Sequence, residues 1–194
     1  ADNVALILGD NIFFGQGLPQ QLRAAASQES GATTFAYRVT DPERYGVVEF
    51  SDDGSPVAFE EKPTKPKSPW AVTGLYFYDS AVIDIARQLK PSSRGELEIV
   101  DIHQAYLKSG NMSVERLGRG IAWLDTGTHD SLLQAGQFVQ TIEQRQNQKI
   151  ACLEEIALRM NYIDADAFQE LAWKHGQTTY GTYLQRIAEE VSSN

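Results

Sequence analysis

The chain has few of the residues that mark disulfide-rich, zinc-binding or membrane-spanning proteins. Its 194 residues include one cysteine, Cys152, which excludes a disulfide framework. The three histidines are not spaced as metal ligands are. No apolar run approaches the roughly 18–20 residues that a membrane span needs. We therefore expect a cytoplasmic protein in a reducing compartment, with no membrane partner.

Basic residues are also scarce. Lys and Arg number 17 against 26 Asp and Glu, and the formal net charge is −9. Because nucleic acid is bound mainly through a basic face, we expect no nucleic-acid partner. An acidic protein can still bind a nucleotide where metal ions and a few local cations neutralise the phosphates.

Strand and helix patterns alternate over most of the chain, and only helical patterns follow. Strands are expected at Val4–Leu8, Ala32–Val39, Val47–Ser51, Val57–Glu61, Trp70–Tyr78, Met112–Leu117 and Ile121–Leu124. Helices are expected at Leu18–Ser27, 79–89, Glu98–Lys108, Thr128–Asn147, Ile150–Met160, Ala165–His175 and Thr182–Val191, and a loop at Asn11–Gly17. This order predicts an α/β body over residues 1–147 with a helical appendage over 148–194.

Two aspartates follow apolar strands in the same way. Asp10 ends the run VALILGD, and Asp125 follows IAWL in IAWLDTGT. Carboxylates at the carboxyl ends of buried strands lie where open α/β sheets bind ligands. Brought together, the pair would suit Mg²⁺ beside a phosphorylated substrate. The alternative is that each aspartate only caps a turn, which is common before Gly or Asn.

Three further motifs carry polar or aromatic groups that could bind a sugar phosphate. Glu61 and Lys62, in EEKP, offer a hydroxyl acceptor and a phosphate-binding cation, or else form a solvated surface pair. Tyr45 and Gly46 offer an aromatic wall beside open backbone, or else begin an edge strand. Arg94, in a Ser/Gly loop, could clamp an oxyanion or simply be solvated.

One strand combines apolar residues with a glycine on a single face. Val72, Gly74 and Tyr76 occupy alternate positions, so they share a face. A glycine there leaves room for a ligand, although packing alone could require it. No G-x-x-x-x-G-K-[ST] phosphate loop and no Ser–His–Asp arrangement occurs in the sequence.

Six motifs occur in an order that resembles the bacterial glucose-1-phosphate thymidylyltransferase family. They are LGDNIFFG, RYGVVEF, EEKP, VTGLYFYD, RGELEIVD and WLDTGT. The resemblance implies a Rossmann-like nucleotide-diphospho-sugar transferase fold with a three-layer α/β sheet. It also implies Mg²⁺-dependent formation of dTDP-glucose and pyrophosphate from dTTP and glucose 1-phosphate. In this family the product leads to dTDP-rhamnose and to lipopolysaccharide or polysaccharide.

The resemblance also assigns roles to residues. It implies that Asp10 and Asp125 hold Mg²⁺, that Lys62 binds the sugar phosphate, and that Arg94 lies near the nucleotide phosphates. The implied sugar pocket comprises Tyr45, Gly46, Glu61, Lys62, Val72, Gly74, Tyr76 and Trp123. The helical tail is similar to that of the long, homotetrameric members, in which a dTDP-sugar binds a second, inhibitory site. Gly15, Arg119, Ala151, Glu155, Ile156 and Arg159 match positions of that site.

The chain departs from the family in one respect. The family begins with a glycine-rich G-G-x-G-T-R-L loop that holds the triphosphate, and this segment is not in the sequence. We therefore expect a fragment that carries the sugar-binding half. Two other functions stay open: a related nucleotidyltransferase that uses UTP, ATP or CTP, and a non-catalytic module for sugar-phosphate binding or oligomerisation.

Overall fold

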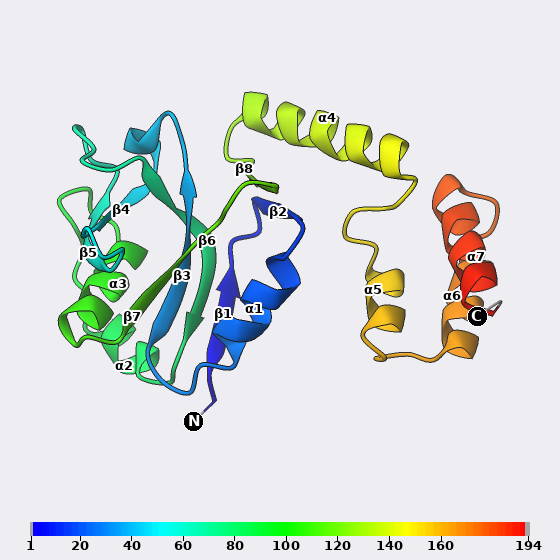
Figure 1. Ribbon diagram of the computed structural model, residues 1–194, viewed down its shortest axis with the longest axis horizontal. Helices are drawn as coiled ribbons and strands as arrows, with labels where there is room; N and C mark the ends of the chain where they lie inside the picture. The colour runs from blue at the N-terminus through cyan, green and yellow to red at the C-terminus, as the bar shows by residue number, and fades with distance from the viewer. Residues whose placement is uncertain (1, 193–194) are drawn as a thin grey trace. The chain divides into compact units, whose positions relative to one another are not determined.

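The computed structural model describes residues 2–192 and divides the chain into two compact units, residues 1–131 and 132–194 (Figure 1). The strands are β1 (Val4–Ile7), β2 (Asn11–Gly15), β3 (Ala32–Arg38), β4 (Gly46–Phe50), β5 (Pro56–Glu61), β6 (Trp70–Tyr78), β7 (Met112–Arg116) and β8 (Ile121–Asp125). The helices are α1 (Leu18–Ala26), α2 (Val82–Arg87), α3 (Ile99–Lys108), α4 (His129–Gln146), α5 (Leu153–Arg159), α6 (Ala165–Lys174) and α7 (Thr179–Ser192), with a 3₁₀ turn at Pro42–Arg44. No helix among the described residues has the length and apolarity to cross a membrane.

The first unit is built on a mixed sheet in the order β5-β4-β6-β3-β7, with β1 also paired to β6. Strand β6 runs antiparallel to β1, β3 and β4, and among the described residues only β3 and β7 pair in parallel. The long apolar run of β6 is almost entirely buried, because both faces of the strand are covered. A mixed α/β fold is therefore confirmed.

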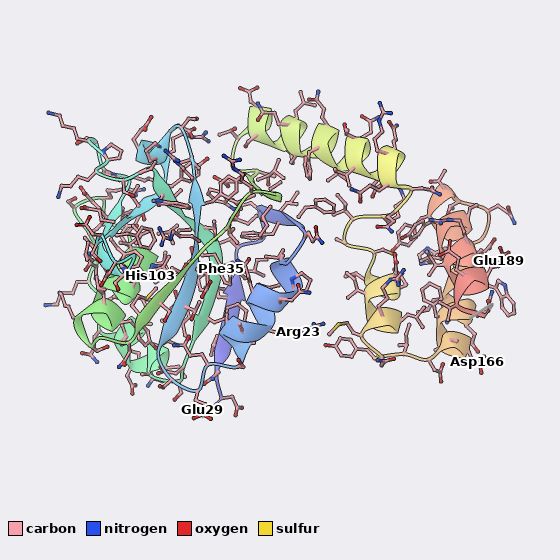
Figure 2. All side chains as sticks on the ribbon, in the orientation of Figure 1. Arg23, Glu29, Phe35, His103, Asp166 and Glu189 are labelled. Carbon is pink, nitrogen blue, oxygen red and sulfur yellow. The ribbon has the colours of Figure 1, made fainter. Side chains whose placement is uncertain are left out.

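Alternation along β3 and β6 sends side chains into two separate cores. Ala32, Ala36 and Tyr76 pack on the face covered by α2 and α3. Phe35 and Leu75 pack on the other face, against α1 and the β2–β8 pair. Phe35 on β3 and His103 on α3, both labelled in Figure 2, are fully buried. The sheet is thus the middle layer of three.

Two expectations about the start of the chain were wrong. Residues Asn11–Gly15 were expected as a loop, but they form β2, which pairs antiparallel with β8. The strand before Asp10 was expected to be buried, but the residues of β1 are exposed, with Ile7 at 56%. The reason is that β1 pairs on one side only, with β6, among the described residues.

The second unit is helical. Its core joins Cys152 before α5, Phe168 and Ala172 on α6, and Leu184 and Ile187 on α7. Asp164 caps the N-terminus of helix α6, and its side chain accepts a hydrogen bond from the Ala167 amide at 2.9 Å. The division of function expected at residue 147 stays a prediction.

Candidate active site

Most of the predicted site residues line one cavity of about 230 Å³ in the first unit. The predicted residues around it are Asp10, Tyr45, Gly46, Glu61, Lys62, Val72, Gly74, Tyr76, Trp123 and Asp125. The sequence analysis missed Leu8, Asn11, Arg44, Ile99 and Val100, which line it as well. The cavity therefore draws on β4, β5, β6 and the β2–β8 pair, which are far apart in the sequence.

The β2–β8 pair brings the two aspartates together. Asn11 lies opposite Asp125 in the ladder, and the Asp10 carbonyl accepts a hydrogen bond from the Thr126 amide at 2.8 Å. A Cβ placed on Gly127 would lie 3.4 Å from Asp125 Oδ1 and 3.8 Å from Asp10 Oδ2. The two carboxylate oxygens are thus no farther apart than the sum of those distances.

Electrostatics at the pair favour a cation. Burial, and next the charge of Asp10, raise the pKa of Asp125, while Arg44 and Lys62 lower it. The repulsion between two nearby negative charges is relieved when a positive ion binds between them. No cluster of three or more His, Cys, Asp or Glu side chains suited to a metal occurs in the described part of the chain. Two carboxylates are nevertheless enough for Mg²⁺, which keeps water and substrate phosphate as its other ligands.

The antiparallel pairing of β4 with β5 places Glu61 opposite Gly46. A Cβ on Gly46 would lie 2.9 Å from Val100 Cγ2 and 3.0 Å from Glu61 Oε2, so only glycine leaves that space open. Lys62 follows with a φ of 42°, in the left-handed region that non-glycine residues seldom adopt. Its amide donates to the Tyr45 carbonyl at 3.0 Å. Backbone strain of this kind is concentrated at functional sites.

Arg94 does not line the cavity but reaches a residue that does. Its Nη1 lies 3.6 Å from Glu61 Oε1 and 3.6 Å from Glu98 Oε1, and its Nη2 lies 3.0 Å from Glu96 Oε2. Burial, and next the charge of Glu98, raise the pKa of Glu61, whereas Lys62 and Arg94 lower it. In this structure Arg94 thus helps to keep a cavity carboxylate ionised.

Aromatic side chains form one wall of the cavity. The Trp123 ring lies 5.1 Å from the Tyr45 ring and 5.8 Å from the Tyr37 ring, measured between centroids. Its indole Nε1 donates a hydrogen bond to Asn11 Oδ1 at 2.6 Å. Asn11 could have been found from the sequence if NIFFG had been recognised as a strand, since it would then face the strand that carries Trp123.

The residues expected at a second nucleotide site are divided between the two units. Gly15 and Arg119 belong to the first unit, where Gly15 pairs with Ile121 in the β2–β8 ladder. Ala151, Glu155, Ile156 and Arg159 belong to the second unit. There Glu155 accepts from Arg159 Nε at 2.7 Å and from the Tyr183 hydroxyl.

Comparison with known sequences identifies relatives over nearly the whole chain. Glucose-1-phosphate thymidylyltransferase of Neisseria meningitidis serogroup A is 56% identical over 97% of this chain and 66% of its own length. The enzyme of that name from Mycolicibacterium smegmatis is 55% identical over 97% of this chain and 65% of its own length. The chain thus spans just under two thirds of the length of these relatives.

Solved structures show the same fold. A Bacillus anthracis protein described as a glucose-1-phosphate thymidylyltransferase, in complex with sucrose, is 42% identical, with a TM-score of 0.63 over 71% of this chain and 54% of that chain. A UDP-glucose pyrophosphorylase complexed with UDP-glucose has a TM-score of 0.64 over 72% of this chain and 56% of that chain. At 18% identity it supports the fold alone. The model of the family described as nucleotidyl transferase matches residues 1–142. The nucleotidyltransferase fold predicted from the sequence is confirmed, and the chain belongs to the nucleotidyl transferase family.

Proposed function

We propose that this chain carries the sugar-phosphate- and metal-binding part of a glucose-1-phosphate thymidylyltransferase, which forms dTDP-glucose and pyrophosphate. The observation that carries the proposal is one cavity in which Asp10 and Asp125 lie with Glu61 and Lys62. The names of relatives above 50% identity support the choice of nucleotide and sugar. The dTDP-rhamnose and polysaccharide pathways are the destination we propose for the product.

The proposed reaction needs no nucleophile from the protein. A phosphate oxygen of glucose 1-phosphate attacks the α-phosphorus of dTTP, the bond from that phosphorus to the β-phosphate oxygen breaks, and pyrophosphate leaves. Because a phosphate dianion is already nucleophilic, the chain's residues contribute positioning and charge neutralisation. Lys62 holds the sugar phosphate, and Glu61 accepts hydrogen bonds from sugar hydroxyls.

Asp10 and Asp125 are the residues that would hold Mg²⁺. Bound there, the ion would neutralise charge on the reacting phosphates, a contribution worth several kcal/mol. The pair suits this ion because both ligands are hard oxygens and their charges repel each other when no cation is present. Arg94 stays our candidate for the nucleotide phosphates, and it would leave its ion pair with Glu61 to reach them.

Calorimetry tests the binding half of this proposal. We expect glucose 1-phosphate to bind this chain, and Asp10→Asn with Asp125→Asn to abolish binding of Mn²⁺ as a probe for Mg²⁺. Asp130→Asn, on an exposed residue at the start of α4, is the control and should bind as the parent does. Failure of the parent chain to bind glucose 1-phosphate would overturn the proposal.

Turnover assays separate this proposal from its alternatives. The chain is joined to the glycine-rich segment typical of the family and incubated with glucose 1-phosphate, Mg²⁺ and dTTP, UTP, ATP or CTP in turn, and pyrophosphate release is measured. Pyrophosphate release with dTTP, and with none of the other three nucleotides, supports the thymidylyltransferase. Preference for another nucleotide would identify a related enzyme, and sugar-phosphate binding without release would mark this chain as a binding module.

We further propose that residues 148–194 serve regulation and assembly. The second site would take a dTDP-sugar at Gly15, Arg119, Ala151, Glu155, Ile156 and Arg159, in a homotetramer. The exposed apolar side chains Leu153, Ile156 and Met160 are spaced to share one face of α5, which supports a role in assembly because a contiguous apolar face is usually covered. Light scattering should give a mass of four chains, and a monomer mass would contradict this assignment.

A further inference from the structure

The Asn11 side chain stands where the aromatic wall of the cavity meets the carboxylate pair. Its Oδ1 accepts two hydrogen bonds, from the Gly74 amide at 2.9 Å and from Trp123 Nε1 at 2.6 Å. Its Nδ2 donates to Asp10 Oδ1 at 2.9 Å. One carboxamide therefore joins β6, β8 and the turn that follows β1.

Hydrogen-bond chemistry fixes the orientation of this carboxamide. Both the Gly74 amide and the Trp123 indole can only donate, so the oxygen must face them. The amide nitrogen is then left to face Asp10, whose carboxylate can only accept. An aspartate at position 11 could keep the two accepted bonds, but it could not donate to Asp10.

Close packing restricts the carboxamide on two sides. A Cβ on Gly74 would lie 2.8 Å from both Asn11 Cγ and Asn11 Oδ1, so the glycine makes room for this side chain. On the other side, the Trp123 ring is held between Tyr45 and Tyr37. A shift of Asn11 would therefore release the indole and the Asp10 carboxylate together.

We propose that Asn11 is a positioning residue that couples the indole wall of the cavity to the carboxylate pair. Where the ligands are concerned, this inference rests on the proposed function. Asn11 holds Trp123 at the angle that shapes the cavity, and it holds one oxygen of Asp10 so that the other stays free for a cation. Affinity for sugar phosphate and affinity for a divalent cation should fall together when the carboxamide is removed.

The test compares Asn11→Ala with Asn3→Ala, which removes an exposed carboxamide that donates a hydrogen bond to the Gln28 carbonyl. Acrylamide quenching reports the mobility of Trp123, taken as the difference from Trp123→Phe. Calorimetry gives the affinities for Mn²⁺ and glucose 1-phosphate. We expect Asn11→Ala to increase quenching and to weaken both affinities about tenfold, the loss of one charge-assisted hydrogen bond. Asn3→Ala should match the parent.

Asn11→Asp separates positioning from simple misfolding. It should keep parent-like quenching, because both accepted bonds survive, while the affinity for Mn²⁺ departs from that of the parent. Parent-like quenching and affinities in Asn11→Ala would overturn the positioning role. If the parent itself binds no glucose 1-phosphate, the proposed function fails, but the quenching difference still decides whether Asn11 holds Trp123.

Discussion

Replacing Gly74 by alanine tests whether the cavity depends on space that only glycine leaves. The added Cβ would meet Leu8 Cδ1 at 2.7 Å and both Asn11 Cγ and Oδ1 at 2.8 Å. Leu8 is 41% exposed and its Cδ1 can turn aside, but the Asn11 carboxamide is hydrogen-bonded to Gly74 and Trp123 and cannot move without losing those bonds. The clash should therefore be relieved by displacing Asn11.

The loss of stability expected for Gly74→Ala follows from the cost of overpacking. Forcing a methyl group into filled space costs about 1–3 kcal/mol. At roughly 2–4 °C per kcal/mol for a chain of this size, the midpoint of thermal unfolding should fall by about 4–8 °C for a cost of ~2 kcal/mol. Affinity for glucose 1-phosphate should fall as well, because Trp123 loses its partner.

Differential scanning fluorimetry and calorimetry measure these two effects. Gly136→Ala is the matched control, since it makes the same change on helix α4 where nothing lies within 4 Å. There alanine should stabilise the helix by about 0.5–1 kcal/mol. A Gly74→Ala chain with the parent's unfolding midpoint and sugar-phosphate affinity would refute the reasoning.

Three further outcomes are expected. Phe35→Ala empties a fully buried position on β3 and should cost about 3–5 kcal/mol in urea unfolding, whereas Leu97→Ala, at 62% exposure, should change little. Arg94→Gln removes a cation that lowers the pKa of Glu61, so the loss of glucose 1-phosphate binding on acidification should begin at a higher pH; an unchanged profile would contradict this. Burial lowers the pKa of His103 from 6.5 to about 3, so between these values the unfolded chain binds more protons than the folded one. The free energy of unfolding should therefore decrease as the pH is lowered from 6.5 towards 3, by up to ~1.4 kcal/mol per pH unit, and His103→Gln should flatten this slope.

The regular elements could largely be predicted from the sequence because their patterns are local. Strand β6 coincides with the apolar run Trp70–Tyr78, and helices α1 and α3 fall within a residue of the expected ranges. The aromatic pair in NIFFG gave no such signal. Whether that segment is loop or strand depends on pairing with β8, which lies more than a hundred residues away.

The residues of the candidate site could likewise be predicted only where the signal is local. Asp10 and Asp125 were found because each follows an apolar strand, and the structure brings them to one cavity. Asn11 and Arg44 were missed because their roles depend on partners in other elements, namely Trp123 for Asn11 and the nearby charge of Asp125 for Arg44. Arg94 could be singled out by its loop, but its pairing with Glu61 could not be read from spacing.

Anomalous diffraction from crystals of this chain grown with Mn²⁺ and glucose 1-phosphate tests the central claim most directly. The account predicts one manganese peak within coordination distance of a carboxylate oxygen of both Asp10 and Asp125, with sugar density beside Glu61 and Lys62. Sugar bound in that cavity with no manganese at the two aspartates, or manganese bound elsewhere, would contradict it.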